Sequence, residues 1–207
     1  MKARAQAYLL LSVTMLVAFL PRLHAFQSFN ADGTFRIIVF SELRYGSNDA
    51  ENAKKQIFQD SVLSAFKPNF VVLNGNMVNG KEWDGKSQTF TQSNWNLFTK
   101  PMVDHGVGWG FTLGSVDLEG NIKNARDLVI YDNSISELSQ TQLASSSIDG
   151  NTFYSLPVHS RSDPSKIIYN LWFFDSTSGV CGGSGSGSNT CISQSQLDAY
   201  QESTSDI

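Results

Sequence analysis

The chain has 207 residues, which suits one domain of ordinary size better than two. It carries 15 basic and 19 acidic residues, a net charge of −4, and contains no basic run. These values exclude the strongly basic class of nucleic-acid-binding proteins, so we expect no nucleic-acid partner.

Residues 1–25 are predicted to be a secretory signal peptide. Lys2 and Arg4 give the segment a basic start, and Tyr8–Leu20 is mostly apolar. This stretch is shorter than the ~20 residues of a spanning helix, which favours a cleaved signal over an uncleaved signal anchor. Residues 26–207 are then expected to form a domain without a stable membrane span, secreted or in the lumen of the secretory pathway.

The first predicted strand, Phe35–Phe40, is an almost unbroken apolar and β-branched run. Such a run is typical of a strand that is buried on both faces in a helix-covered sheet. It leads directly into Ser41, Glu42, Leu43 and Arg44. Open α/β folds place their sites at the carboxyl ends of buried strands, so this exit is the first candidate site.

A helix and a second strand follow the first exit. Ala50–Phe66 has the spacing of an amphipathic helix, and the apolar run Phe70–Leu73 exits through Asn74, Gly75 and Asn76. The order strand, helix, strand within about thirty residues makes a βαβ unit, which predicts a parallel pair of strands.

A third strand is predicted at Val107–Leu113, after a polar loop (Lys81–Gln92) and a helix (Trp95–Asp104). It exits through Gly114-Ser115-Val116-Asp117. An apolar strand followed by a polar turn thus occurs three times, and this repetition favours a site over three unrelated turns.

The second half of the chain is predicted to add helices and two strands. Ile122–Tyr131 and Ser134–Leu143 have helical patterns, Asn151–Pro157 and Ile167–Phe174 have strand patterns, and a helix begins within Ile192–Tyr200.

The two cysteines, Cys181 and Cys191, flank a Gly/Ser-rich loop. In an oxidising compartment a disulfide between them is the favoured interpretation. A metal pair is the alternative, although two cysteines alone cannot complete a structural zinc site.

Taken together, the three exits resemble the metal-binding motifs of the calcineurin-like metallophosphoesterases, most closely a eukaryotic branch related to purple acid phosphatases. The flanking segments that share this likeness are Val71–Leu73, Trp83-Asp84, Thr112–Gly114 and Leu171–Ser176. The resemblance implies an α/β/β/α sandwich in which residues 26–207 form a truncated domain with an incomplete second half. The family uses a dinuclear divalent metal centre to activate water for attack on a phosphoester.

The first two exits depart from the family motifs, which read Asp-x-His and Gly-Asp. Glu42 stands at the aspartate position, and Arg44 stands where a histidine ligand is expected. Arginine stays charged and has no lone pair to offer a cation. Asn76 replaces the aspartate that would bridge both metals, and a neutral amide cannot neutralise two dications.

Of the functional side chains in the family's Gly-Asn-His-Asp/Glu motif, the third exit keeps only Asp117. Ser115 replaces a ligand asparagine, and Val116 replaces the catalytic histidine. The family's later histidines have no counterpart here, since His105 and His159 match no motif and are expected in surface loops.

The resemblance therefore implies a catalytically inactive phosphoesterase-like protein with no metal cofactor. A guanidinium at ~4 Å from a dication would cost about 8 kcal/mol at an effective dielectric of about 20. Glu42, Asn76 and Asp117 are only weak metal candidates. Arg44 is interpreted either as a partner of a nearby carboxylate or as a weak anion-binding group.

Two alternatives stay open at this point. One is an active phosphoester hydrolase with a rearranged site that groups Glu42, Asn76, Asp117, Asp175 and His105 around one metal, although Asp175 fits a cap of the following loop as well. The other is a fragment-like domain whose exposed sheet face is covered by a partner chain or by self-association.

Overall fold

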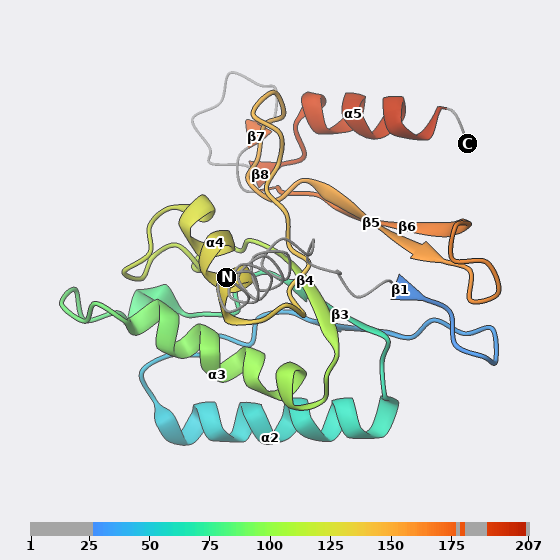
Figure 1. Cartoon of the computed structure of the whole chain (residues 1–207). Helices are drawn as coiled ribbons and strands as arrows, with labels where there is room; N and C mark the ends of the chain where they lie inside the picture. The colour runs from blue at the N-terminus through green and yellow to red at the C-terminus, as the bar shows by residue number, and fades with distance from the viewer. Residues whose placement is uncertain (1–26, 177–178, 181–189, 206–207) are drawn as a thin grey trace, which may run out of the picture.

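The computed structural model describes residues 27–176, 179–180 and 190–205, and the fold is mixed α/β (Figure 1). The first three-stranded sheet consists of β2 (Ile37–Phe40), β3 (Phe70–Asn74) and β4 (Gly108–Thr112). The second consists of β1 (Gln27–Ser28), β5 (Tyr154–His159) and β6 (Ile167–Phe173). A short pair is formed by β7 (Gly179–Val180) and β8 (Thr190–Cys191). The helices are α2 (Asp49–Phe66), the 3-10 helix η1 (Gly80–Glu82), α3 (Phe90–Asp104), α4 (Ala125–Ile135) and α5 (Gln194–Thr204). None of these described helices combines the length and apolar character that crossing a membrane requires.

The βαβ prediction is confirmed. β2 and β3 pair in parallel, with Ile37 opposite Phe70, and β4 joins β3 in parallel on its other side. The connecting helix α2 begins where the Asn48 side chain accepts from the N–H of Glu51, and it ends at Lys67, which adopts the left-handed conformation. The sequence places these elements correctly because an apolar strand, a capped helix and a second apolar strand leave few other arrangements.

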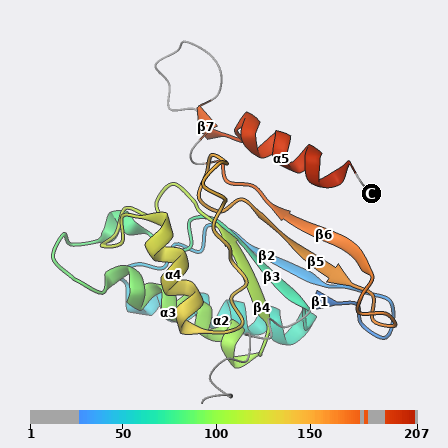
Figure 2. The same ribbon diagram turned by 45° about the horizontal axis from the view of Figure 1, so that its top comes forward.

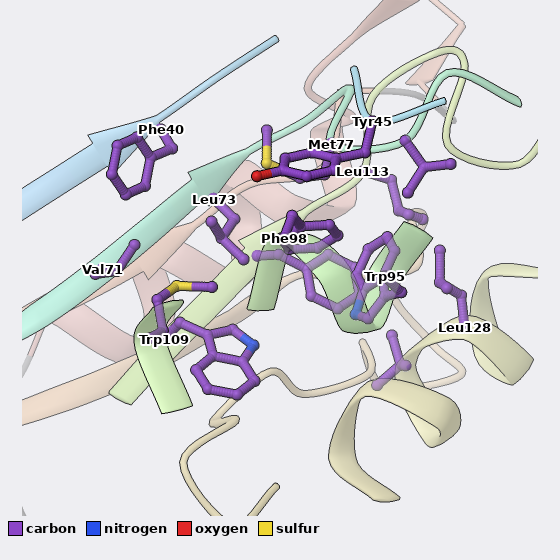
Figure 3. Packing of buried hydrophobic residues seen from close by; sticks show 14 of the residues in the cluster. Phe40, Tyr45, Val71, Leu73, Met77, Trp95, Phe98, Trp109, Leu113 and Leu128 are labelled. Carbon is purple, nitrogen blue, oxygen red and sulfur yellow. The ribbon is translucent and has the colours of Figure 1, made fainter. Parts of the chain in front are cut away.

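Helices α2, α3 and α4 cover one face of the β2-β3-β4 sheet (Figure 2). Figure 3 shows the core that they enclose, in which the rings of Trp95 and Phe98 from α3 meet at 4.7 Å and Trp109 enters from β4. Trp95, Phe98 and Trp109 have no exposed surface. Burial of each such aromatic side chain contributes about 2–3 kcal/mol, so this layer holds the strand ends in place.

The other face of the same sheet packs on β5 and β6. Gly110 of β4 lies where a Cβ would meet the Tyr154 hydroxyl at 2.8 Å, so only glycine allows this close approach of the two sheets. The Tyr154 hydroxyl donates to the Phe111 carbonyl at 2.9 Å, and the rings of Phe70 and Phe173 meet edge to face at 6.5 Å. These contacts make the two sheets face each other.

Helix α5 lies on the outer side of the second sheet (Figure 2), where Tyr200 contacts Trp172 at a ring distance of 5.1 Å. Its Gln196 side chain bonds both the N–H and the carbonyl of Asp175. The Asp175 carboxylate accepts from the N–H groups of Asn151 and Thr152, so it caps the preceding loop.

Three expectations from the sequence are wrong. β2 is an edge strand, so Ile37 and Val39 are exposed and the strand is not buried on both faces. Ser134–Leu143 is not a helix: α4 ends at Ile135, and the chain then pairs with β4 through the N–H of Gln140 and the Trp109 carbonyl (2.8 Å). His159 is buried at the end of β5 and not in a surface loop.

Two predictions fall on residues that the structure does not describe. The signal peptide at residues 1–25 lies wholly outside the described residues. The disulfide between Cys181 and Cys191 involves Cys181, which also lies outside them. Both stay predictions.

One carboxylate is buried at the centre of the helical layer. Asp132 has no exposed surface, and its oxygens accept from the indole N–H groups of Trp95 (2.7 Å) and Trp109 (3.1 Å) and from the Ser139 hydroxyl. Burial raises the pKa of Asp132, and these hydrogen bonds oppose the rise. Asp132 therefore ties α3, α4 and β4 together through polar contacts.

We predict that Asp132→Ala lowers the free energy of unfolding by about 3 kcal/mol, because it leaves two buried indole donors without an acceptor. Asp127→Ala, an exposed aspartate in the first turn of the same helix, is the control and should cost less than about 1 kcal/mol. Urea unfolding at pH 7 measures both. Equal costs for the two variants would contradict the assigned role of Asp132.

The raised pKa of Asp132 also sets a pH dependence. Because the folded state holds the proton more tightly than the unfolded state, stability falls as pH rises from about 4 through the folded pKa. Asp132→Asn cannot ionise, so its stability relative to the wild type should increase over the same rise. A relative stability that does not change with pH would contradict this.

Candidate functional site

The three strand exits lie side by side at the carboxyl edge of the parallel sheet, as their recurrence suggested. Past the end of β2, the first exit stays paired with the second. The N–H of Glu42 donates to the Gly75 carbonyl (3.1 Å), and the N–H of Arg44 donates to the Asn76 carbonyl (3.0 Å). The pairing of β2 with β3 is thus extended into the site, which fixes the backbones of these loops.

The third exit is joined to the second by one carboxylate. Asp117 is 1% exposed, and its oxygens accept from the backbone N–H groups of Asn76 (2.8 Å), Val78 (3.0 Å) and Gly114 (2.8 Å). Burial raises the pKa of Asp117, and these backbone hydrogen bonds oppose the rise. Asp117 is therefore a structural clamp between the second and third exits.

Glycines let the second and third exits touch. Gly75 has a φ of 74°, and a Cβ there would lie 2.9 Å from the Gly114 Cα. A Cβ on Gly114 would lie only 2.2 Å from the backbone nitrogen of Asn76. The exits meet backbone to backbone, which leaves little room for an ion between them.

Glu42, Arg44 and Asn76 form a connected polar group on this edge. Arg44 Nε lies 2.6 Å from Glu42 Oε2, and the Asn76 amide donates to the other Glu42 oxygen. The hydrogen bond from Asn76, followed by that from Arg44, lowers the pKa of Glu42. The Asn76 carbonyl oxygen Oδ1 accepts from the N–H of Val116 at 3.0 Å. Arg44 is thus a partner of a carboxylate, as one of its two interpretations expected.

The same three residues share an unusual backbone conformation. Glu42, Arg44 and Asn76 have φ values of 58°, 49° and 56°, in the left-handed region that side chains other than glycine seldom occupy. Of these three residues, only Asn76 is a type that tolerates this region well. Strain of this kind gathers at functional sites and directs side chains in fixed directions. No sequence pattern indicated it.

The residues at the strand exits do not fit a dinuclear metal centre. Glu42 is engaged by Arg44 and Asn76, and both Asp117 oxygens are engaged by backbone N–H groups. Ser115 is exposed and Val116 is a buried apolar residue. Across the part of the chain that the structure describes, no cluster of three or more His, Cys, Asp or Glu side chains could hold a metal ion.

The remaining candidates lie elsewhere. His105 follows α3 and precedes the amino end of β4, about 16 Å along the sheet from the strand exits, and its Nε2 lies 2.8 Å from Asp60 of α2. Asp175 serves the 151–152 backbone. The rearranged site that would include His105 and Asp175 beside Glu42 is therefore not formed.

Sequence reasoning missed two groups that support the first exit. Lys55 of α2 donates to the Arg44 carbonyl at 2.6 Å. Glu82 of η1 accepts from the backbone and hydroxyl of Ser47 (2.8 and 3.0 Å), and the backbone bond of Ser47 lowers the pKa of Glu82. The only signal for Lys55 is its place on the helix face that points to the strand exits.

Comparison with known proteins leaves the family open. No model of a known protein family matches the chain, and no curated protein matches it either.

We predict that Arg44→Gly is more stable than Arg44→Ala by about 1 kcal/mol. Both variants lose the half-exposed ion pair, but only glycine relieves the left-handed conformation. At Arg36, which also makes an exposed ion pair but has no positive φ, the order should reverse. Guanidinium unfolding of the four variants measures these differences. If Arg44→Gly is less stable than Arg44→Ala, the backbone at position 44 is not strained.

Proposed function

We propose that this chain is a secreted, non-catalytic relative of the calcineurin-like metallophosphoesterases. Its three exits carry that family's motif positions, and the layer order, helices, two facing sheets and a further helix, is the one that the resemblance implies. The chain keeps the scaffold that brings the exits together. At the site itself, Glu42, Arg44 and Asn76 bind one another.

One observation carries this proposal: the atoms that would bind a metal ion already make hydrogen bonds or an ion pair within the protein. Arg44 places its cationic group 2.6 Å from Glu42, where a metal would need that carboxylate. Asn76 uses both ends of its amide within the protein, and Asp117 accepts three backbone hydrogen bonds. A cation entering this site would have to break these contacts and lie beside a fixed positive charge, which costs several kcal/mol.

We predict that residues 26–207, prepared without chelator, bind no stoichiometric Mn²⁺ or Zn²⁺ by calorimetry and elemental analysis. They should also release no product from an aryl phosphate between pH 4 and 9. Arg44→His together with Asn76→Asp restores two ligand types and removes the repelling charge, so this double variant should bind one cation measurably. Arg36→His is the control and should bind none. Stoichiometric metal with turnover in the wild type would show an active hydrolase instead.

A second function, weak anion binding at Arg44, has one observation in its favour. The ion pair with Glu42 uses only Nε, and the side chain is 51% exposed, so the outer edge of the guanidinium faces solvent. Such an edge suits bidentate contact with a phosphate or carboxylate. The negative charge of Glu42 limits the affinity to the millimolar range.

We predict that phosphate binding, measured by calorimetry at low ionic strength, is lost in Arg44→Ala and kept in Arg36→Ala. Arg36 is the matched control because it also forms a half-exposed ion pair, with Asp32. No heat with wild type, or equal heat in both variants, would remove the anion site while leaving the non-catalytic proposal intact.

A further inference from the structure

The second sheet ends in an open edge at β6. β6 pairs only with β5, and the order β1-β5-β6 leaves its other side without a neighbouring strand among the described residues. Its seven residues, Ile167–Phe173, read Ile-Ile-Tyr-Asn-Leu-Trp-Phe and include no charge and no proline. Edge strands usually carry such residues, which block pairing with other chains. β6 carries neither a charge nor a proline, and its ladder with β5 is regular from Tyr169 to Phe173, with a register shift only beside Ile168.

Apolar side chains are exposed on both sides of this edge. Tyr169 is 63% exposed, Ile167 51% and Ile168 40%. Val39 on β2, the edge strand of the facing sheet, is 59% exposed, and Ile37 beside it is 36% exposed. The Phe29 ring meets both Phe35, which precedes β2, and Tyr169 of β6, so these two edge strands lie on the same side of the facing sheets.

A groove also runs along the outer face of β6. It has a volume of about 400 Å³ and lies between β6 and α5, with Ile168, Trp172 and Tyr200 among its lining residues. A strand that binds at this edge could therefore pair with the backbone of β6, and it would contact an apolar surface on one side and a groove on the other. An extended, uncharged and largely apolar segment fits all three.

We propose that β6 pairs antiparallel with β6 of a second copy of this chain, so that the edge closes into a two-fold dimer. The proposal is independent of the assigned function. β6 is itself an extended, uncharged and apolar segment, so it is complementary to its own edge. Centred on Asn170, the pairing sets Tyr169 opposite Leu171 of the other copy, within the part of β6 that pairs regularly with β5. No like charges face each other in this ladder.

The pairing of β6 with β5 also favours Asn170 as the centre of the contact between the two copies. Pro157 lies opposite Asn170 and has no N–H to donate, which favours directing the N–H and carbonyl of Asn170 to the open edge.

The exposed area is compatible with a dimer of moderate strength. The five exposed side chains of β6 and β2 present on the order of 400 Å², about half of the ~800 Å² that a standard interface buries on each partner. The backbone edge of β6 and the groove beside α5 supply the remainder. We therefore expect a dimer that forms at micromolar concentration.

The first test is sedimentation velocity on residues 26–207 over a range of concentrations. Wild type should show a concentration-dependent monomer–dimer equilibrium, and Ile168→Lys should weaken it at least tenfold. Ile57→Lys makes the same change at a residue that is 67% exposed on α2, and it should leave the equilibrium unchanged. Thermal melts confirm that both variants fold. A wild type that stays monomeric at 100 µM, or that forms open-ended aggregates, would overturn the proposal.

Cross-linking tests the register. Asn170→Cys places two cysteines on the two-fold axis, with Cα atoms about 4.5–5.5 Å apart, within the span of a disulfide. It should give a covalent dimer on a non-reducing gel. Ile167→Cys sets its two cysteines about 20 Å apart and should give none. Equal cross-linking of both variants, or of neither, would overturn the pairing centred on Asn170.

Discussion

The buried carboxylate of Asp117 is the contact on which the arrangement of the strand ends depends. It draws the N–H groups of Asn76, Val78 and Gly114 to one point, and thereby holds the second and third exits against each other. A carboxylate in this role has both oxygens engaged and almost no exposed surface. Hydrogen bonds within the protein therefore hold the two loops together at this edge.

The outer part of the site follows from that clamp. With Asn76 held by its backbone, its amide reaches Glu42, and Arg44 completes the charge balance from the first exit. All three residues occupy the left-handed region, where glycine would be less strained. Arg44 is half-exposed, so its charge faces solvent at this edge.

The sequence predicted the first sheet better than its surroundings. Apolar runs at β3 and β4 and the capped helix α2 carry strong local signals, and the meeting of the exits follows from parallel pairing. The exposure of Val39 was missed, because an apolar run reads the same at the edge of a sheet as at its centre. The segment after Ile135 pairs with β4 through backbone hydrogen bonds, which leave no periodicity in the sequence. Within the site, residue types were informative about charge, whereas the left-handed backbone and the clamp of Asp117 depend on contacts between distant segments.

The central claim is that protein contacts have replaced paired metal ions at the strand ends. Its most direct test is a crystal of residues 26–207 soaked in manganese, with anomalous scattering measured at the metal edge. The account predicts no anomalous peak between Glu42 and Asn76, with Arg44 still paired to Glu42. Two strong peaks at that position, with the arginine displaced, would contradict it.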